Sequence, residues 1–197
     1  MDDDILKDML LDGGMAMAIN KGYLTCDRTQ KGDEVYTPYY AVEPLLEFIP
    51  KNKIIWCPFD EEWSAFYNTF KENGYKVIRS SLSEGQDYFT YEPEEWDIMV
   101  SNPPFSKKDK VLARAYELNK PFCLLLPVNS IQGKNRHEIF KNDIQLLVFD
   151  ARVDYHTNFN MNTYTKGNHF GSAYFCRNIL PTKLELRNLN KYERKLA

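Results

Sequence analysis

The sequence lacks the features of membrane, secreted and strongly basic proteins. It contains no apolar run approaching the roughly 18–20 residues that a membrane-spanning helix needs. Three aspartates follow Met1, where a signal peptide has a basic start. Its 25 basic and 28 acidic side chains leave a net charge of −3, which argues against a nonspecific nucleic-acid coat but not against a local basic surface. We therefore expect a soluble, cytoplasmic protein.

Metal and redox motifs are also lacking. The four cysteines lie far apart, without the paired spacing that structural zinc sites and redox motifs use. The three histidines have no metal-ligand spacing, and Glu138 beside His137 does not complete a two-histidine zinc helix. These absences predict reduced structural thiols and no bound metal.

The chain is long enough to form one domain with a full hydrophobic core. It has 197 residues, of which 43% are hydrophobic and 14% aromatic. The clearly patterned residues 35–181 are expected to form this domain. Residues 1–34 are expected to form an arm that either covers the site as a lid or docks loosely. Residues 182–197 are expected to form a tail that lies on the surface or is partly disordered.

Short apolar runs alternate with helical patterns through the middle of the chain. Apolar residues at helical spacing mark the segments 39–49, 63–70 and 111–118, and Thr37 is placed as the N-cap of the first helix. The expected strands occupy residues 53–59, 75–79, 96–100 and 121–126, with a further short strand or an edge turn at 86–89. Continuous apolar strands joined by helices predict an open α/β structure, with a mostly parallel sheet covered by helices on both faces.

The pattern changes from Gln145 onward. Residues 146–149 and 171–176 read as strands with no clear helix between them, which predicts an antiparallel hairpin that finishes the sheet. The polar and aromatic residues 152–170 between these strands form either a substrate loop or a disordered one.

Ligands of an open parallel sheet bind beyond the carboxyl ends of its strands, so the loops that follow the strands are the candidate sites. Three loops qualify, and we expect them to share one rim of the sheet. They are Pro58-Phe59-Asp60, Ser101 to Phe105, and Pro127 to Ser130.

The loop Ser101-Asn102-Pro103-Pro104-Phe105 is the most distinctive stretch of the chain. Asn102 and Pro103 each precede a proline, which pushes both toward extended conformations and fixes the Asn102 side chain and the Pro103 carbonyl. Two hydrogen-bond acceptors are thus held beside the ring of Phe105. This arrangement suits a planar substrate with an exocyclic amino group, because the acceptors take its N–H bonds and the ring stacks on its face.

These residues resemble the class I S-adenosylmethionine-dependent methyltransferases that methylate amino groups. Their signature after the fourth strand is Asn-Pro-Pro-Phe or Asn-Pro-Pro-Tyr, and Asn102-Pro103-Pro104-Phe105 matches it at every position. The resemblance extends over residues 34–181 to the adenine-N6 methyltransferases of phages and bacteria. In those proteins a Tyr-Thr-Pro phrase, here Tyr36-Thr37-Pro38, helps to hold the methionine end of the cofactor.

The resemblance implies a Rossmann-like methyltransferase fold that uses S-adenosylmethionine. It places Asp87 and Tyr88 near the adenine of the cofactor. It also implies that the loop Pro58-Phe59-Asp60 and Ser101 contact the cofactor. It implies that Asn102 and Pro103 stabilise the positive charge that develops on the amine, while Phe105 stacks on a base that is flipped out or already unpaired.

Two features depart from the family pattern. The first-strand loop is normally rich in glycine so that the backbone can approach the cofactor, whereas residues 57–62 contain none. A carboxylate usually follows the second strand to bind the ribose, but Arg79-Ser80-Ser81 stands there. Asp60 is expected either to take over this role or to cap a helix that starts at Glu61.

A local basic surface is expected on the same rim despite the acidic total. Its residues follow the catalytic loop and the strand 121–126. Together they suit the binding of a phosphate backbone, whereas each lysine taken alone is equally typical of the solvated start of a helix. They are Lys107, Lys108, Lys110, Lys134 and Arg136.

The expected function is methylation of the N6 amino group of adenine in DNA, with RNA as the second candidate substrate. Two alternatives stay open. The same acceptors suit the amide of a protein glutamine, and the loop without glycines suits a catalytically silent binding module. We expect no large target-recognition domain after the core, so target choice is expected to come from residues 152–170 or from a partner protein, or to be loose.

Overall fold

The structure, a computed structural model, describes residues 35–141, 143–156 and 170–191. The predicted arm, residues 1–34, lies outside the described residues, as do most of the predicted substrate loop and residues 192–197 of the predicted tail. The two interpretations of the arm, and those of the loop, therefore stay predictions.

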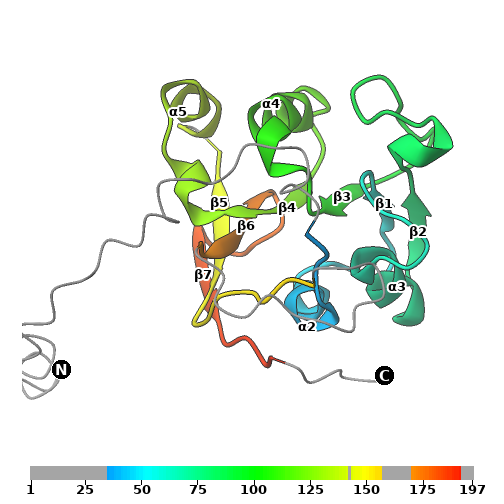
Figure 1. The fold of residues 1–197 in the computed structure, drawn as a ribbon, viewed down its shortest axis with the longest axis horizontal. Coiled ribbons are helices and arrows are strands. Elements are labelled where there is room, and N and C mark those ends of the chain that lie inside the picture. Colours follow the sequence, from blue (N-terminus) through cyan, green and yellow to red (C-terminus); the bar gives the residue numbers. More distant parts are fainter. Residues whose placement is uncertain (1–34, 142, 157–169, 192–197) are drawn as a thin grey trace, which may run out of the picture.

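A seven-stranded sheet forms the centre of the molecule (Figure 1), in the order β2-β1-β3-β4-β6-β5-β7. Its strands are β1 (Ile54–Cys57), β2 (Lys76–Arg79), β3 (Ile98–Ser101), β4 (Phe122–Pro127), β5 (Gln145–Phe149), β6 (Ser172–Arg177) and β7 (Leu184–Arg187). The first four strands pair in parallel, and β6 runs antiparallel between β4 and β5. The predicted Rossmann-like architecture, a mostly parallel sheet with an antiparallel C-terminal hairpin, is confirmed.

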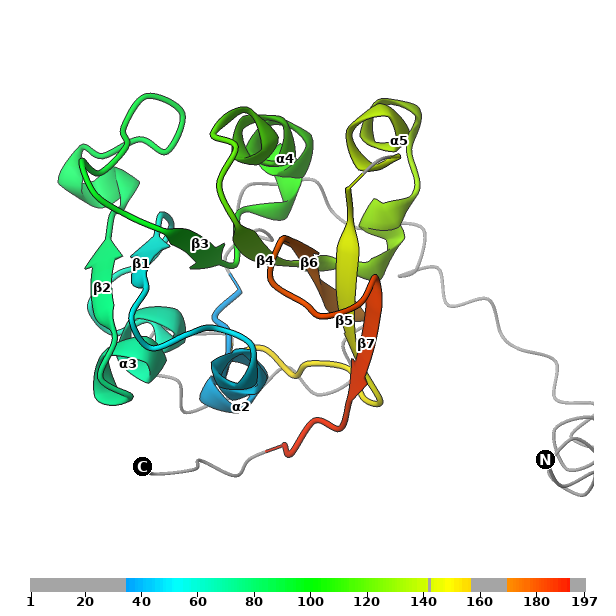
Figure 2. The same cartoon turned by 180° about the vertical axis from the view of Figure 1, so that it is seen from behind.

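Two layers of helices cover the sheet. Figures 1 and 2 show α4 and α5 on one face, with α2 and α3 on the other. The α-helices are α2 (Tyr39–Val42), α3 (Ala65–Glu72), α4 (Lys108–Glu117) and α5 (Lys134–Phe140). Short 3₁₀ segments adjoin them: η3 (Glu43–Glu47), η4 (Leu82–Glu84), η5 (Phe105–Lys107) and η6 (Val128–Ile131).

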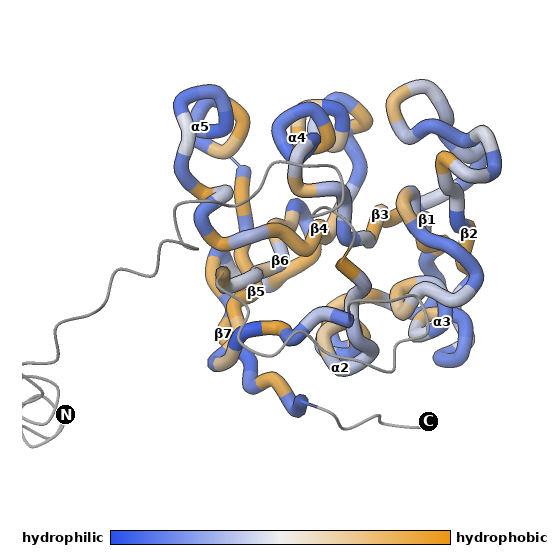
Figure 3. Tube along the Cα trace, viewed as in Figure 1, coloured by the Kyte–Doolittle hydropathy of each residue, from blue (hydrophilic) through white to orange (hydrophobic). Residues whose placement is uncertain are grey.

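Both faces of the central strands are buried, as the continuous apolar runs predict. Ile55 and Cys57 of β1 pack into the core on one side of the sheet, whereas Trp56 between them packs into the core on the other side. The indole of Trp56 donates a hydrogen bond of 2.9 Å to Ser80 Oγ, which satisfies its one polar atom in the core. Figure 3 shows hydrophobic residues gathered on the strands, with hydrophilic ones on the outer turns of α4 and α5.

The structure corrects the prediction for the first helix. Pro38 rather than Thr37 occupies the N-cap position, and no side chain caps this helix. The α-helix continues only to Val42 and then tightens into the 3₁₀ segment η3, which has Pro44 in its first turn. Proline has no N–H to donate to an earlier carbonyl, so the regular α-helical bonding does not continue through it.

The segment 86–89 is a turn, one of its two predicted forms, rather than a strand. Asp87 Oδ1 accepts a hydrogen bond of 3.0 Å from the backbone N–H of Phe89, and the Asp87 carbonyl accepts another from Thr90. An aspartate that bonds its own backbone in this way favours a turn over a strand ladder. The motif therefore follows the third strand of the structure, not the fourth.

The sheet does not end with the predicted hairpin. Leu184–Arg187, in the predicted surface tail, form β7, which pairs in parallel with β5 at the edge of the sheet. Helix α5 was not among the predicted helices. Within the described residues, no helix has both the length and the apolar character of a membrane span.

Candidate active site

The three candidate loops share one rim, as predicted. Strands β1, β3 and β4 are parallel neighbours, so their carboxyl ends meet at the same edge of the sheet. A cavity of about 180 Å³ opens there between the first loop and the motif. It is lined by Val35, Tyr36, Thr37, Phe59, Asp60, Trp63, Ser64, Ala65, Phe66, Asn102 and Pro104.

Asn102 lines this cavity and carries a hydrogen-bond acceptor that is unused within the described residues. Its Nδ2 donates a hydrogen bond of 3.4 Å to the carbonyl of Val35, which fixes the orientation of the amide. Its Oδ1 is buried, and no group in the described part of the chain donates to it. A buried acceptor without a donor is unfavourable by roughly 1–3 kcal/mol, so the arrangement favours a ligand that brings an N–H or O–H.

The two prolines and the residues that follow them hold the motif in place. Pro103 is buried, and Pro104 adopts an extended conformation, with φ −59° and ψ 124°. The carbonyl of Pro104 accepts a hydrogen bond of 3.0 Å from the backbone N–H of Lys107, which closes the turn into η5. The backbone that carries Asn102 is therefore fixed on both sides.

The ring of Phe105 is half-buried and packs edge to face against two aromatic rings. Its centroid lies 5.6 Å from that of Phe170 and 6.3 Å from that of Tyr155. Tyr155 is itself fixed by a hydrogen bond of 2.8 Å from its hydroxyl to Ser172 Oγ. These contacts limit the rotation of Phe105.

Asp60 is a buried carboxyl group that joins the first loop to the motif strand. Ser101, the last residue of β3, donates its hydroxyl to Asp60 Oδ2 at 2.5 Å. Burial raises the pKa of Asp60 to about 7, although hydrogen bonds from Ser101 and Ser64 act in the opposite direction. The group is thus poised to change its charge near neutral pH.

The alternative that Asp60 caps a helix at Glu61 is wrong. Helix α3 begins at Ala65 with Ser64 in the N-cap position, and Ser64 Oγ accepts a hydrogen bond of 2.8 Å from the Glu61 N–H. Trp63, predicted to lie on the face of this helix, precedes it and is 37% exposed. Asp60 instead lines the cavity, together with Trp63 and Ser64, which no sequence pattern marked as site residues.

The Tyr36-Thr37-Pro38 phrase lies next to the motif. Tyr36 exchanges two backbone hydrogen bonds with His156, of 3.1 and 2.8 Å, and its ring meets Trp63 edge to face at 4.9 Å. Thr37 is 5% exposed, and its hydroxyl has no hydrogen-bond partner among the described residues. The cavity therefore contains a second buried polar atom that a ligand could satisfy.

Other predicted cofactor residues do not line this cavity. Pro38 and Pro58 are buried beside it, and Asp87 bonds its own turn. Tyr88 is 2% exposed, and its hydroxyl donates to the Val111 carbonyl at 3.2 Å. Burial raises the pKa of Tyr88, so its phenol stays neutral in the core.

Acidic side chains do converge at the carboxyl end of β2, although none of the residues 80–83 that directly follow the strand is acidic. Arg79 forms ion pairs with Glu84 at 2.8 Å, Glu62 at 3.5 Å and Glu61 at 4.0 Å. The Ser83 hydroxyl donates to Glu61 at 2.6 Å. No pattern in the sequence indicated this convergence, because its members come from two separate loops.

The predicted basic surface is only partly free to bind an anion. Arg136 forms an ion pair with Asp109 and also donates to the Gln132 carbonyl, so its guanidinium is already engaged. Lys108 donates to the Phe105 carbonyl at 3.2 Å. Lys107 and Lys134 are exposed.

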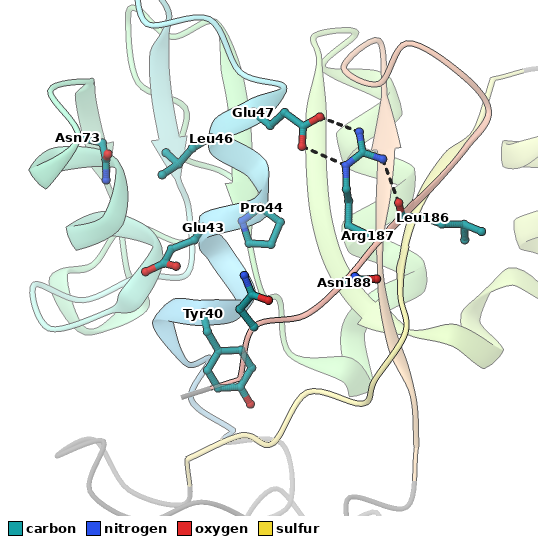
Figure 4. Close-up of a pocket in the computed structure, with 10 residues that line it drawn as sticks. Tyr40, Glu43, Pro44, Leu46, Glu47, Asn73, Leu186, Arg187 and Asn188 are labelled. Atoms are coloured by element: carbon teal, nitrogen blue, oxygen red, sulfur yellow. Dashed lines mark hydrogen bonds and ion pairs between the residues drawn. The ribbon is translucent and has the colours of Figure 1, made fainter. Parts of the chain in front are cut away.

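A cavity of about 670 Å³ lies elsewhere, between η3 and β7 (Figure 4), and shares no residue with the three rim loops. Glu47 and Arg187 face each other across it, with contacts of 2.7 and 3.0 Å. The hydrogen bond from Arg187 lowers the pKa of Glu47. This paired arrangement contains no unsatisfied group comparable to Asn102 Oδ1.

Comparisons with known proteins add little to this description. No protein-family model matches the chain, and no curated protein matches it. One matching solved structure, from Listeria monocytogenes, is provisionally described as a class I S-adenosylmethionine-dependent methyltransferase. It is 12% identical, with a TM-score of 0.41, and the match covers 78% of this chain and 65% of that chain. These values are too low to support a conclusion about cofactor, substrate or activity.

Proposed function

We propose that this protein is an S-adenosylmethionine-dependent methyltransferase that acts on the N6 amino group of adenine in DNA. The observation that carries the proposal is the buried, unpartnered Asn102 Oδ1, which is fixed in direction by Val35 and the two prolines. An exocyclic amine supplies the N–H that this acceptor lacks. Hydroxyl substrates could also donate, but they use only one of the two acceptors that the motif fixes.

The motif acts on the amine through charge and position. Asn102 Oδ1 accepts one N–H bond, and the carbonyl of Pro103 accepts the other. The two acceptors draw the nitrogen toward tetrahedral geometry and stabilise the positive charge that develops on it, without acting as strong bases. Phe105, limited in its rotation by Tyr155 and Phe170, supports the face of the base, which requires an unpaired or flipped adenine.

The residues around the 180 Å³ cavity fit the methionine end of the cofactor. S-adenosylmethionine supplies an activated methyl group and carries positive charge, for which the buried Asp60 carboxylate is the matching partner. The hydroxyl of Thr37 has no partner and can bond the polar groups of an amino acid. Tyr36, Thr37 and Asp60 are therefore the residues that would hold this group.

A catalytically silent binding module is the second candidate, and a specific observation favours it. Phe59 and Trp63 place aromatic side chains on the cavity where the family has glycines. Phe59 also packs on Tyr88, with ring centroids 4.8 Å apart, which fixes it in the first loop. In this reading the cavity binds an amino group without transferring a methyl group to it.

Transfer of labelled methyl from S-adenosylmethionine tests the proposal. We expect label in single-stranded DNA, less in RNA, and none in protein. If label appeared only in protein glutamine, the substrate would be a protein amide rather than adenine. If calorimetry detected no cofactor binding, only the catalytically silent module would remain. Asn188→Ala, in the unrelated 670 Å³ cavity, is the control variant and should bind and transfer like the unmodified protein.

A further inference from the structure

A second cavity adjoins the end of the motif loop and is lined by none of the residues of the 180 Å³ cavity. It has a volume of about 680 Å³ and is lined by Phe89, Ser106, Lys107, Asp109 and Lys110. Ser106 directly follows Phe105 in the chain. The wall of this second cavity therefore begins at the residue that directly follows the motif.

The charge of the second cavity is positive. Lys107 and Lys110 are exposed and lie three residues apart, a spacing that brings side chains together over one turn. Neither forms an ion pair with any residue that the structure describes. Asp109, the one acidic residue of the lining, is paired with Arg136 and so does not neutralise the lysines. The cavity is thus suited to anionic groups.

The cavity also has an aromatic surface that is fixed in position. Phe89 is half-buried, and its ring meets Tyr88 edge to face at 5.4 Å. Tyr88 in turn is anchored by its hydroxyl on α4. A fixed ring beside two unpaired cations offers both a stacking face and phosphate contacts, which is how single-stranded nucleic acids are bound. A simple anion would use the lysines but not the ring.

We propose that this cavity binds a nucleotide next to the target adenine in an unpaired strand, an inference that rests on the proposed function for its target. The neighbouring base stacks on Phe89, and the phosphates on its two sides contact Lys107 and Lys110. The same phosphate chemistry occurs in DNA and RNA. Because the contacts are to phosphates and one base face, the cavity selects an unpaired strand rather than a particular sequence.

Fluorescence anisotropy with labelled 12-nucleotide DNA and RNA strands of one sequence tests this proposal without any methyl transfer. The double variant Lys107→Gln and Lys110→Gln should bind about tenfold more weakly at low salt. Its plot of log affinity against log salt should be shallower by about 1.4, since two single-strand phosphate contacts are lost. Phe89→Leu should also weaken binding several-fold while leaving the salt dependence unchanged.

Lys76→Gln with Lys183→Gln is the matched control, because it removes the same charge from exposed positions outside the cavity. The proposal is overturned if the unmodified protein binds neither strand, or if the cavity and control variants bind equally. It is also overturned if the cavity variant loses S-adenosylmethionine binding in calorimetry while it still binds the strand. Lysine-dependent strand binding without any methyl transfer would support this cavity and refute the proposed function instead.

Discussion

At the scale of single residues, the site combines one buried acid with two buried polar groups that have no hydrogen-bond partner within the described ranges. Thr37 Oγ1 and Asn102 Oδ1 both lack hydrogen-bond partners in the described part of the chain, and Asp60 lies at the same cavity. Unsatisfied buried groups reduce stability, and a ligand that donates to Asn102 and bonds Thr37 would remove this cost at both positions. The sequence predicted Thr37, Asp60 and Asn102 as site residues, but not that two of them would be left unsatisfied.

Replacement of Thr37 by valine distinguishes a role of its hydroxyl in the stability of the protein from a role in binding the cofactor. Valine has nearly the same shape and removes a hydroxyl that is buried without a partner, so we expect the free energy of unfolding to stay within about 0.5 kcal/mol or to rise. Cofactor affinity should fall about tenfold. Urea unfolding and calorimetry measure the two quantities. A loss of stability above about 1 kcal/mol would show that the hydroxyl has a structural partner.

Asp60 gives the protein a distinctive dependence of stability on pH. Its pKa of about 7 in the folded protein lies above the ordinary aspartate value of 3.8, so the folded protein binds this proton more tightly than the unfolded chain does. The resulting stability is fully present below about pH 4 and is lost as the pH rises through 7. The free energy of unfolding of Asp60→Asn should therefore exceed that of the unmodified protein by more at pH 8 than at pH 5. We expect this excess to grow by on the order of 2 kcal/mol between the two pH values. Denaturant unfolding of both proteins at pH 5 and pH 8 measures these free energies. The same difference in free energy of unfolding between the two proteins at both pH values would contradict the expectation.

At the scale of elements, the sequence predicted the parts whose structure follows from continuous apolar runs. Strands β1, β3 and β4 are buried on both faces, so nearly every residue in them is apolar. Helix α5 was missed because only Ile139 and Phe140 near its end are apolar. Strand β7 was missed because Leu184 and Leu186 are exposed, which leaves no core pattern to detect.

The start of α3 illustrates what local patterns leave open. Ser64 is the N-cap by position and also accepts the Glu61 N–H, while it supports the carboxylate of Asp60. These contacts depend on how the first loop folds back, which spacing alone does not reveal. One of the two interpretations of Asp60 placed the helix start at Glu61, four residues before its actual start at Ala65.

Ser64→Ala should reduce the free energy of unfolding by about 1 kcal/mol, because the variant loses the hydrogen bond that closes the turn before α3. It should also raise the pKa of Asp60 further, since one of the hydrogen bonds that lower this pKa disappears. Urea unfolding across the pH range measures both effects. Ser83→Ala, which removes a more exposed hydroxyl, serves as the comparison and should change stability less.

At the scale of the whole molecule, the parallel sheet determines where the site lies. Three neighbouring strands end at one rim, and residues more than 40 positions apart meet there, such as Ser101 and Asp60. The general location of the site could therefore be predicted from strand order. The cluster of Glu61, Glu62 and Glu84 around Arg79 could not, since it depends on the paths of two separate loops.

The edge strand β7 contributes to the stability of the whole sheet. It pairs with β5 along its full length, and Arg187 reaches across to Glu47 on η3. A chain that ends at residue 181 should therefore melt at least about 5 °C lower in a thermal scan. The control is Leu184→Gln, which alters an exposed side chain and keeps the strand pairing. Equal melting temperatures for the truncated and complete chains would contradict the contribution of β7.

The rate of methyl transfer under single-turnover conditions, followed as N6-methyladenine in a single-stranded DNA oligonucleotide, examines the role of Asn102. Removal of one preorganised group that stabilises developing charge lowers such rates by roughly 100-fold or more. We expect Asn102→Ala to lose at least this much while it retains the fold and cofactor affinity, with Asn188→Ala unchanged. Equal rates for Asn102→Ala and the unmodified protein would contradict the assignment of this cavity as a methyltransferase site.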